Sequence, residues 1–225
     1  MNDRCRTTIN HYLLRALCLW GALTLPAGLR AQDSDLRFQV VDTSGVVTVY
    51  RDQTNENSRL HKGEYIDDGD RIITPKNGEV VLRLKGRAYF HLSHGTRIRV
   101  LRARVGDNKQ PLIRFNLVYG HVLCQMDMPN AISYVVTADS VTCRAHGVLG
   151  EVARKNEEVQ LTAFEGAMVA NARGHVEMAK ANQVMGFNHG QFRFRHYLHI
   201  EEEGRLQEWQ DHLAEIRKKK APAGH

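Results

Sequence analysis

The feature that most constrains the fold of this chain is a rhythm of short apolar–polar alternations between residues 38 and 188. Gly, Asn and Asp separate the runs, which cover residues 45–50, 78–84, 88–92, 96–101 and 159–164. A period of two is typical of half-buried strands, because successive side chains point to opposite faces of a sheet. No linker divides the region, so we predict one all-β domain over residues 38–190.

The middle of this region predicts which side chains face inward. The positions of one parity are mostly apolar: Val80, Leu82, Leu84, Ala88, Phe90, Leu92, Thr96, Ile98 and Val100. The opposite parity carries five basic residues and an aromatic one, which we take as a candidate ligand-binding face: Arg83, Lys85, Arg87, Tyr89, Arg97 and Arg99. Such a face suits an anionic ligand. The alternative is that these cations keep an outer sheet face solvated and block edge pairing.

Residues 1–31 have the organisation of a secretory signal peptide. Three arginines precede the apolar run 16–25, and small residues follow it up to Ala31. The run is shorter than the roughly 20 residues of a spanning helix. Cleavage would remove four of 31 Lys/Arg and one of 25 Asp/Glu, leaving a net charge of about +3. We expect a periplasmic or secreted protein that begins at Gln32 and does not bind nucleic acid; an uncleaved anchor is the alternative.

Two cysteines, Cys124 and Cys143, remain after the signal. An even pair in an oxidising compartment predicts a disulfide, and two buried reduced thiols are the alternative. His121 and His146 lie three residues from them, which is suggestive of zinc. Residues three apart on a strand point to opposite faces, however, so these side chains do not converge. We predict no metal and no cofactor.

The period changes in the C-terminal segment, residues 191–225. Leu206, Trp209, Leu213 and Ile216 recur at spacings of three and four, which predicts an amphipathic helix at about 204–219. Acidic residues near its start and basic residues at its end complement the helix dipole. We expect the apolar stripe to dock on the β-domain; a membrane or partner surface is the alternative.

No catalytic signature is visible in the sequence. It contains no Gly-x-Ser-x-Gly elbow, metalloprotease helix or phosphate-binding loop. His91 and His94 are not expected to act as a pair, because they fall on opposite faces of a strand. The acidic run 67–70 lacks the ligand spacing of a calcium loop and predicts a tight turn instead. We therefore expect no enzymatic activity.

One stretch of the sequence resembles the FecR-domain family. The most specific part is a leading strand at 45–51, then Gly69-Asp70, Ile72-Ile73-Thr74 and a strand at 78–84; weaker likeness extends over residues 40–187. The resemblance implies a β-solenoid-like periplasmic domain of a bacterium. In some family members such a domain relays an outer-membrane signal inward through a cytoplasmic anti-sigma segment. Only a few residues precede the signal here, so we do not expect direct control of a sigma factor.

These observations favour a non-enzymatic, exported binding or scaffolding module. Its expected partner is an envelope protein or an anionic envelope polymer. A periplasmic sensory module of a trans-envelope signalling system is the first alternative, and an uncleaved anchor would favour it. A carbohydrate-active enzyme on a β-scaffold is the second, and it would need carboxylates that converge in a groove.

Overall fold

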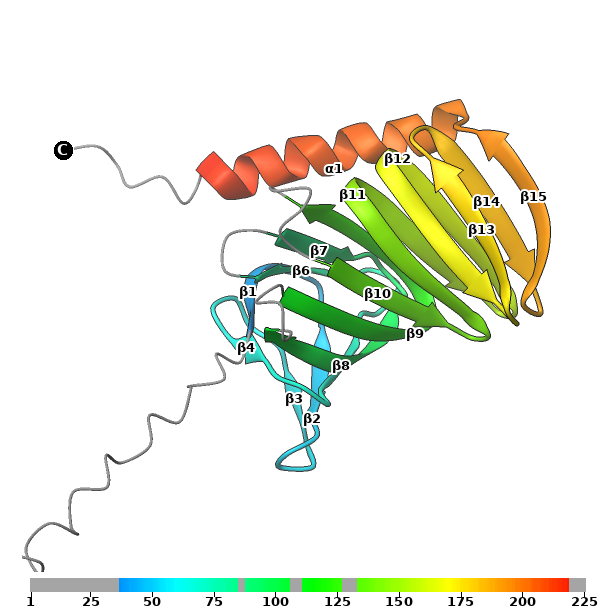
Figure 1. Ribbon diagram of the computed structural model, residues 1–225. Helices are drawn as coiled ribbons and strands as arrows, with labels where there is room; N and C mark the ends of the chain where they lie inside the picture. Colours follow the sequence, from blue (N-terminus) through cyan, green and yellow to red (C-terminus); the bar gives the residue numbers. More distant parts are fainter. Residues whose placement is uncertain (1–36, 85–87, 106–110, 127–132, 219–225) are drawn as a thin grey trace, which may run out of the picture. The chain divides into compact units, whose positions relative to one another are not determined.

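The computed structural model describes residues 37–84, 88–105, 111–126 and 133–218, so the predicted signal peptide lies outside the described residues. The described residues are mostly β, with one C-terminal helix, α1 (Ile200–Lys218) (Figure 1). In chain order the strands are β1 (Phe38–Ser44), β2 (Thr48–Arg51), β3 (Glu56–Arg59), β4 (Tyr65–Ile66), β5 (Arg71–Ile73), β6 (Glu79–Leu84), β7 (Ala88–Leu92), β8 (Arg97–Val105), β9 (Pro111–Met126), β10 (Ser133–Ala138), β11 (Val141–Lys155), β12 (Glu158–Ala172), β13 (His175–Lys180), β14 (Gln183–Asn188) and β15 (Gln191–Tyr197). None of the described helical residues form a segment long and apolar enough to cross a membrane.

The strands form a small closed five-stranded barrel with further strands added, so the predicted solenoid is wrong. In a solenoid, successive coils stack in parallel. Here the ladder between β9 and β10 is parallel, and the other ladders between described strands are antiparallel. The sheet also continues through β15, beyond the boundary predicted at residue 190.

The long strand β9 belongs to two halves of the sheet. The first part of β9 pairs with β8 and β10, whereas its second part pairs with β7 and β11. The change occurs near Gly120, which has a φ of 95°. A side chain there would place its Cβ 2.3 Å from the hydroxyl oxygen of Thr96. Only glycine fits this position without strain, because other residues disfavour positive φ.

The core lies on the inward parity predicted from the alternation. Val80, Leu82, Phe90 and Ile98 are each at most 1% exposed. Aromatic side chains fill its centre, and the ring centroids of Phe90 and Phe115 lie 5.1 Å apart. This region therefore has the period-two burial of a sheet with one face packed on the core.

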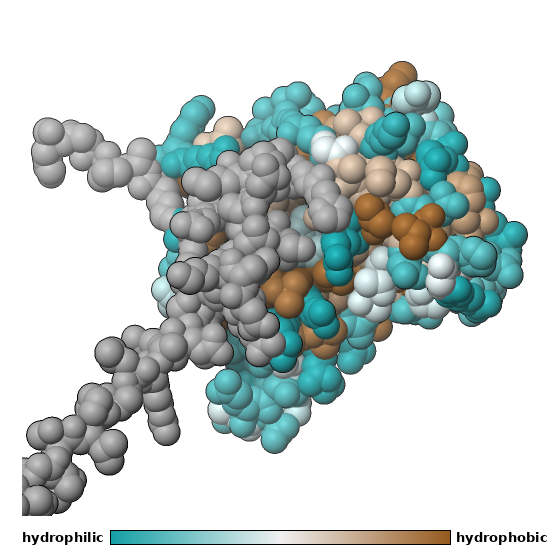
Figure 2. Space-filling model, in the orientation of Figure 1, coloured by the Kyte–Doolittle hydropathy of each residue, from teal (hydrophilic) through white to brown (hydrophobic). Residues whose placement is uncertain are grey.

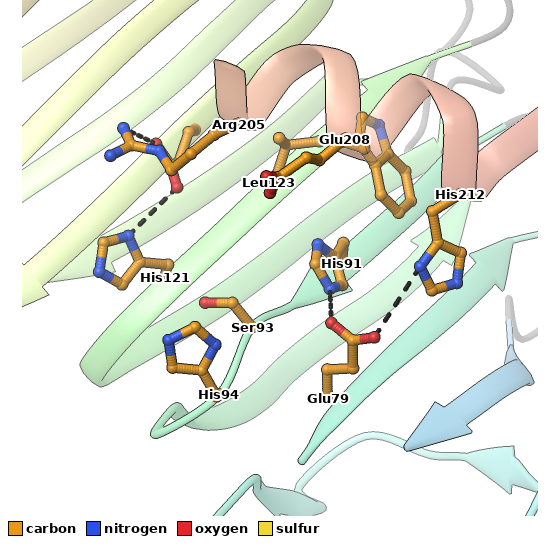
Figure 3. Close-up of a pocket in the computed structure, with 11 residues that line it drawn as sticks. Glu79, His91, Ser93, His94, His121, Leu123, Arg205, Glu208 and His212 are labelled. Atoms are coloured by element: carbon orange, nitrogen blue, oxygen red, sulfur yellow. Dashed lines mark hydrogen bonds and ion pairs between the residues drawn. The ribbon is translucent and has the colours of Figure 1, made fainter. Parts of the chain in front are cut away.

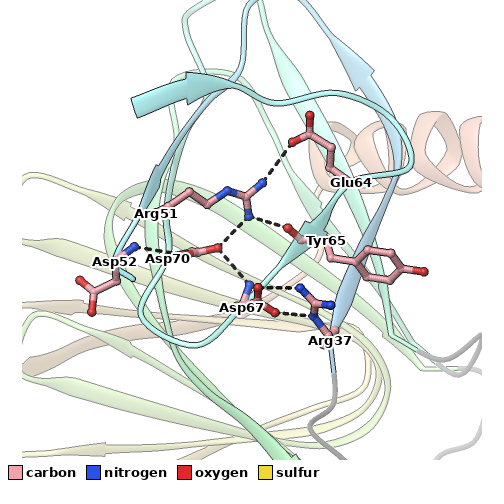
Figure 4. Close-up of polar contacts among 7 residues, drawn as sticks. All are labelled: Arg37, Arg51, Asp52, Glu64, Tyr65, Asp67 and Asp70. Carbon is pink, nitrogen blue, oxygen red and sulfur yellow. Dashed lines mark hydrogen bonds and ion pairs between the residues drawn. The ribbon is translucent and has the colours of Figure 1, made fainter. Parts of the chain in front are cut away.

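The acidic run 67–70 forms the turn between β4 and β5, as predicted (Figure 4). The carboxylate of Asp70 is buried and accepts hydrogen bonds from the backbone N–H groups of Asp52 and Asp67, at 3.2 and 3.0 Å. It also forms an ion pair with Arg51 at 2.9 Å. These partners satisfy a charge that would otherwise be costly to bury.

Helix α1 covers the outer face of one half of the sheet. It begins earlier than predicted, because the side chain of Glu202 accepts a hydrogen bond from the backbone N–H of His199 at 2.9 Å and caps the first turn. Trp209, Leu213 and Ile216 are buried, and Leu206 is partly buried. They pack on an apolar cluster of the sheet: Val41, Val81, Tyr89, Leu123, Leu149 and Phe164.

Candidate functional site

A pocket of about 340 Å³ lies between α1 and the sheet, at the lower end of the size range of ligand sites. Its floor comes from β6, β7, β9, β11 and the turn after β7, and its roof comes from α1 (Figure 3). Most of the side chains that line the pocket are polar or titratable, and Leu123 is the apolar exception. The full lining is Glu79, His91, Ser93, His94, His121, Leu123, Glu151, Arg205, Glu208, Trp209 and His212.

One end of the pocket is organised by Glu79. A carboxylate oxygen of Glu79 lies 2.9 Å from Nε2 of His91, and the hydrogen bond with His91 lowers the pKa of Glu79. The imidazole of His212, on α1, lies 3.8 Å from Glu79 and 3.1 Å from Asp42 of β1. The indole of Trp209 stacks on His91, with centroids 4.9 Å apart and 7° between the planes.

The other end is organised by Glu151, which is 6% exposed. Its carboxylate lies 3.1 Å from Nδ1 of His121 and 3.1 Å from the guanidinium of Arg205 on α1. Burial alone would raise the pKa of Glu151, but the hydrogen bond with His121 and the charge of Arg205 hold it below its usual value. The carboxylate of Glu151 therefore stays ionised near neutral pH, because a hydrogen bond and an adjacent opposite charge favour the charged form.

Two further features of the lining bear on its chemistry. His121 and Glu151 form the imidazole–carboxylate half of a hydrolytic triad, but no described imidazole is hydrogen-bonded to the hydroxyl of Ser93. No group of three or more metal-ligating side chains occurs among the described residues. Within that part of the chain Ser93 and Glu208 have no hydrogen-bond partner for their side chains, so both are free to meet an occupant.

A second pocket, of about 490 Å³, shares His121 with the first. It crosses β11, β12 and β14 and reaches Phe194 of β15. The ring of Phe194 lies directly on Gly186, where a Cβ atom would be 2.3 Å from it.

The structure divides the described members of the predicted basic face into two groups, of which Arg83 and Tyr89, opposite each other on β6 and β7, form the first. Arg83 donates a hydrogen bond to Gln39 at 2.7 Å, and Tyr89 is buried beneath the guanidinium of Arg217, 5.3 Å from its ring centroid. Arg97 and Arg99 lie instead on β8. β7 and β8 pair with different parts of β9, which separates the two groups. Lys85 and Arg87 lie outside the described residues.

Arg99 is also already engaged. It donates a hydrogen bond to the carbonyl oxygen of Gly69 at 3.2 Å and lies 3.4 Å from Asp52. Its guanidinium thus helps to hold the turn between β4 and β5. An ion pair of this kind, partly exposed, contributes little to stability but reduces the charge offered to a ligand.

The predicted disulfide is wrong, because Cys124 and Cys143 are both free and buried. Cys124 lies opposite Phe90 and Gly150 in its ladders, and Cys143 lies opposite Val136 and Ala170, so no ladder places the two cysteines opposite each other. Burial raises the pKa of both thiols. They therefore act as apolar core side chains.

Comparisons with known proteins show a likeness of fold. No family model and no curated protein matches the sequence. The structure resembles a crystal structure of a candidate anti-sigma factor from Parabacteroides distasonis ATCC 8503, with a TM-score of 0.50 and 13% identity over 61% of this chain and 64% of that chain. A second crystal structure under the same description matches with a TM-score of 0.47 and 12% identity, over 56% of this chain and 59% of that chain. The matched region is thus less than two thirds of those proteins.

Proposed function

We propose that this protein is a non-enzymatic, exported sensory module of the bacterial envelope, built on a FecR-type domain. A fold shared with a candidate anti-sigma factor supports a signalling-related β-domain. The N-terminal residues support export. In this proposal the signal is the binding of an envelope protein or another envelope component in the pocket beneath α1.

One observation carries the proposal: the residues that line the pocket are also the residues that hold α1 in place. Glu79, His91 and Glu151 of the sheet contact His212, Trp209 and Arg205 of the helix, respectively. An occupant that hydrogen-bonds to these sheet residues competes with the helix or reinforces it. Binding would therefore change the docking equilibrium of α1, which is the kind of differential contact that a conformational signal requires.

The alternative of a glycoside-cleaving enzyme is less well supported. Such enzymes need one carboxylic acid that stays protonated near neutral pH, with a raised pKa. The pKa values of Glu79 and Glu151 are both shifted downward by their partners. Both groups are therefore ionised where a general acid would have to carry a proton.

Photo-crosslinking in the native host tests the proposed function. A photoreactive residue would replace Glu208 at the pocket, and a control would carry it at Gln210, which is exposed on α1 and does not line the pocket. We expect irradiation to give a defined adduct from position 208 that position 210 does not give. We also expect hydrogen exchange in α1 to change when the captured component is added. Equal adducts from both positions, or unchanged exchange, would contradict the proposal.

A further inference from the structure

A row of arginines crosses the outer face of the half of the sheet that α1 leaves open. Arg102 of β8 lies opposite Arg114 of β9, and Arg114 lies opposite Val135 of β10. Val135 in turn lies opposite Arg144 of β11. Beyond Arg144, the same line of opposed residues continues with Val169 of β12 and Met178 of β13, which are apolar.

These arginines point away from the core and are accessible. Arg114 and Arg144 are exposed and Arg102 is half-buried, while the residues on either side of Arg114 and Arg144 along their strands are buried. In the described part of the chain none of the three forms an ion pair or side-chain hydrogen bond. This distinguishes them from Arg51, Arg99 and Arg205, which carboxylates already engage.

A hollow of about 500 Å³ lies at one end of the row. Arg144 and Arg173 supply positive charge to it. Ser140, Thr142 and Asn171 add hydroxyl and amide groups, and Val169 and Val176 supply apolar surface. Figure 2 shows hydrophobic residues set among hydrophilic ones over β10 to β13. Asp139 lies beside the hollow, but Ser140 and Arg154 already contact its carboxylate, at 3.0 and 3.6 Å.

The electrostatics of the row favour an anionic ligand. Like charges directly opposite each other on antiparallel strands are destabilising, as Arg102 and Arg114 are. An anion between them removes that repulsion. Arg114 and Arg144 are separated by one strand, which sets their backbones about 10 Å apart. Charges spaced in this way match several acidic groups on a chain better than they match a single small anion.

We propose that this arginine face, consisting of Arg102, Arg114, Arg144 and Arg173, binds a linear anionic polysaccharide. The arginines pair with its carboxylate, phosphate or sulfate groups. The hydroxyl and amide side chains in the hollow hydrogen-bond to sugar hydroxyls, and the valines contact the C–H faces of the rings. A concave site fits a chain laid across the strands, whereas the surface of an anionic membrane is flat and gives the hollow no role.

This inference goes beyond the proposed function, because it uses a different face and different residues. None of the four arginines lines the pocket beneath α1. A variant of the arginine face should leave the adduct from position 208 unchanged. Failure of one proposal is therefore distinguishable from failure of the other.

The test measures the affinity of the chain from residue 32 for two anionic probes, polygalacturonate and dextran sulfate, with neutral dextran as reference. The variant R114S/R144S removes two charges from the row. The control R59S/K62S removes two charges from exposed positions elsewhere. We expect R114S/R144S to raise the Kd for both anionic probes by at least about tenfold. Each lost charge-assisted contact should raise the Kd roughly severalfold. We expect the slope of log Kd against log salt concentration to fall by about two.

Several outcomes would overturn the proposal. Equal affinity of R114S/R144S and R59S/K62S would show that binding depends on net charge alone. Binding to phosphatidylglycerol vesicles without binding to the two anionic glycans would assign the face to a membrane instead. Tight binding to neutral dextran would remove the role of charge. If R114S/R144S does not fold, the single variant Arg144→Glu takes its place, with the melting temperature as the check on folding.

Discussion

Trp209 combines burial, ring stacking and a hydrogen bond at one position on α1. Its indole is 3% exposed, stacks on His91 and donates a hydrogen bond from Nε1 to Gln125 at 2.8 Å. A buried indole with a satisfied N–H contributes both apolar area and orientation. This residue therefore holds the helix at the middle of the pocket.

Replacement of this indole gives the first prediction. Trp209→Ala should lower the free energy of unfolding by about 3–5 kcal/mol, because it leaves a cavity and an unpaired Gln125. Leu206→Ala, at a partly buried position on the same helix, is the control and should cost less. Chemical denaturation measures both. Equal and small losses would show that α1 contributes little to the stability of the sheet.

The paired carboxylates give a prediction about pH. The pKa values of Glu79 and Glu151 are lower in the folded protein than the ordinary value of 4.5. Groups with a lowered folded pKa stabilise the native state above the unfolded pKa and lose that contribution as the pH falls through the folded pKa. The free energy of unfolding should therefore decrease as the pH drops below about 4.5.

Two variants separate this effect from general acid denaturation. Glu151→Gln should flatten the decrease, because the amide does not titrate. Glu165→Gln, at an exposed position with no described partner, should leave the pH profile as in the parent protein. The measurement is denaturant unfolding between pH 3 and pH 7. Parallel profiles for all three proteins would contradict the assignment.

At the scale of the element, β9 bends at Gly120. Gly120→Ala should destabilise the protein by about 1–3 kcal/mol or more, because it adds a side chain at positive φ and against Thr96. Gly174→Ala is a matched control: its φ is also positive, at 87°, but nothing lies within 4 Å of the added Cβ. The difference between the two melting curves isolates the contact with Thr96. No difference would mean that the strand can shift to accommodate the methyl group.

At the scale of the whole molecule, the sequence predicts the elements better than their arrangement. The alternation at Val80, Leu82 and Phe90 correctly predicts strands and their buried face. The spacing of Trp209 and Leu213 correctly predicts a helix with an apolar stripe. These are local signals, because each depends on residues a few positions apart.

The arrangement depends on pairings that the alternation does not contain. A period of two is the same whether a strand joins a solenoid coil or one half of a bent strand such as β9, so the solenoid expectation followed from the resemblance and not from the pattern. The sequence does not predict the pocket for a related reason. Glu79, His121 and Arg205 come from segments far apart in the chain, and no spacing in the sequence links the histidines to one another. The arginine row likewise exists only in the register across strands.

The contacts of α1 also constrain the order in which the protein folds. His212 meets Asp42 across a separation of 170 residues, and the helix packs on strands that range from β1 to β12. Closing so long a loop is entropically costly until the intervening strands have paired. We therefore expect helix docking to be a late step, and interactions made after the rate-limiting barrier affect mainly the unfolding rate. A pocket roofed by α1 comes into existence only when the rest of the chain is already native, so only fully folded molecules can present it.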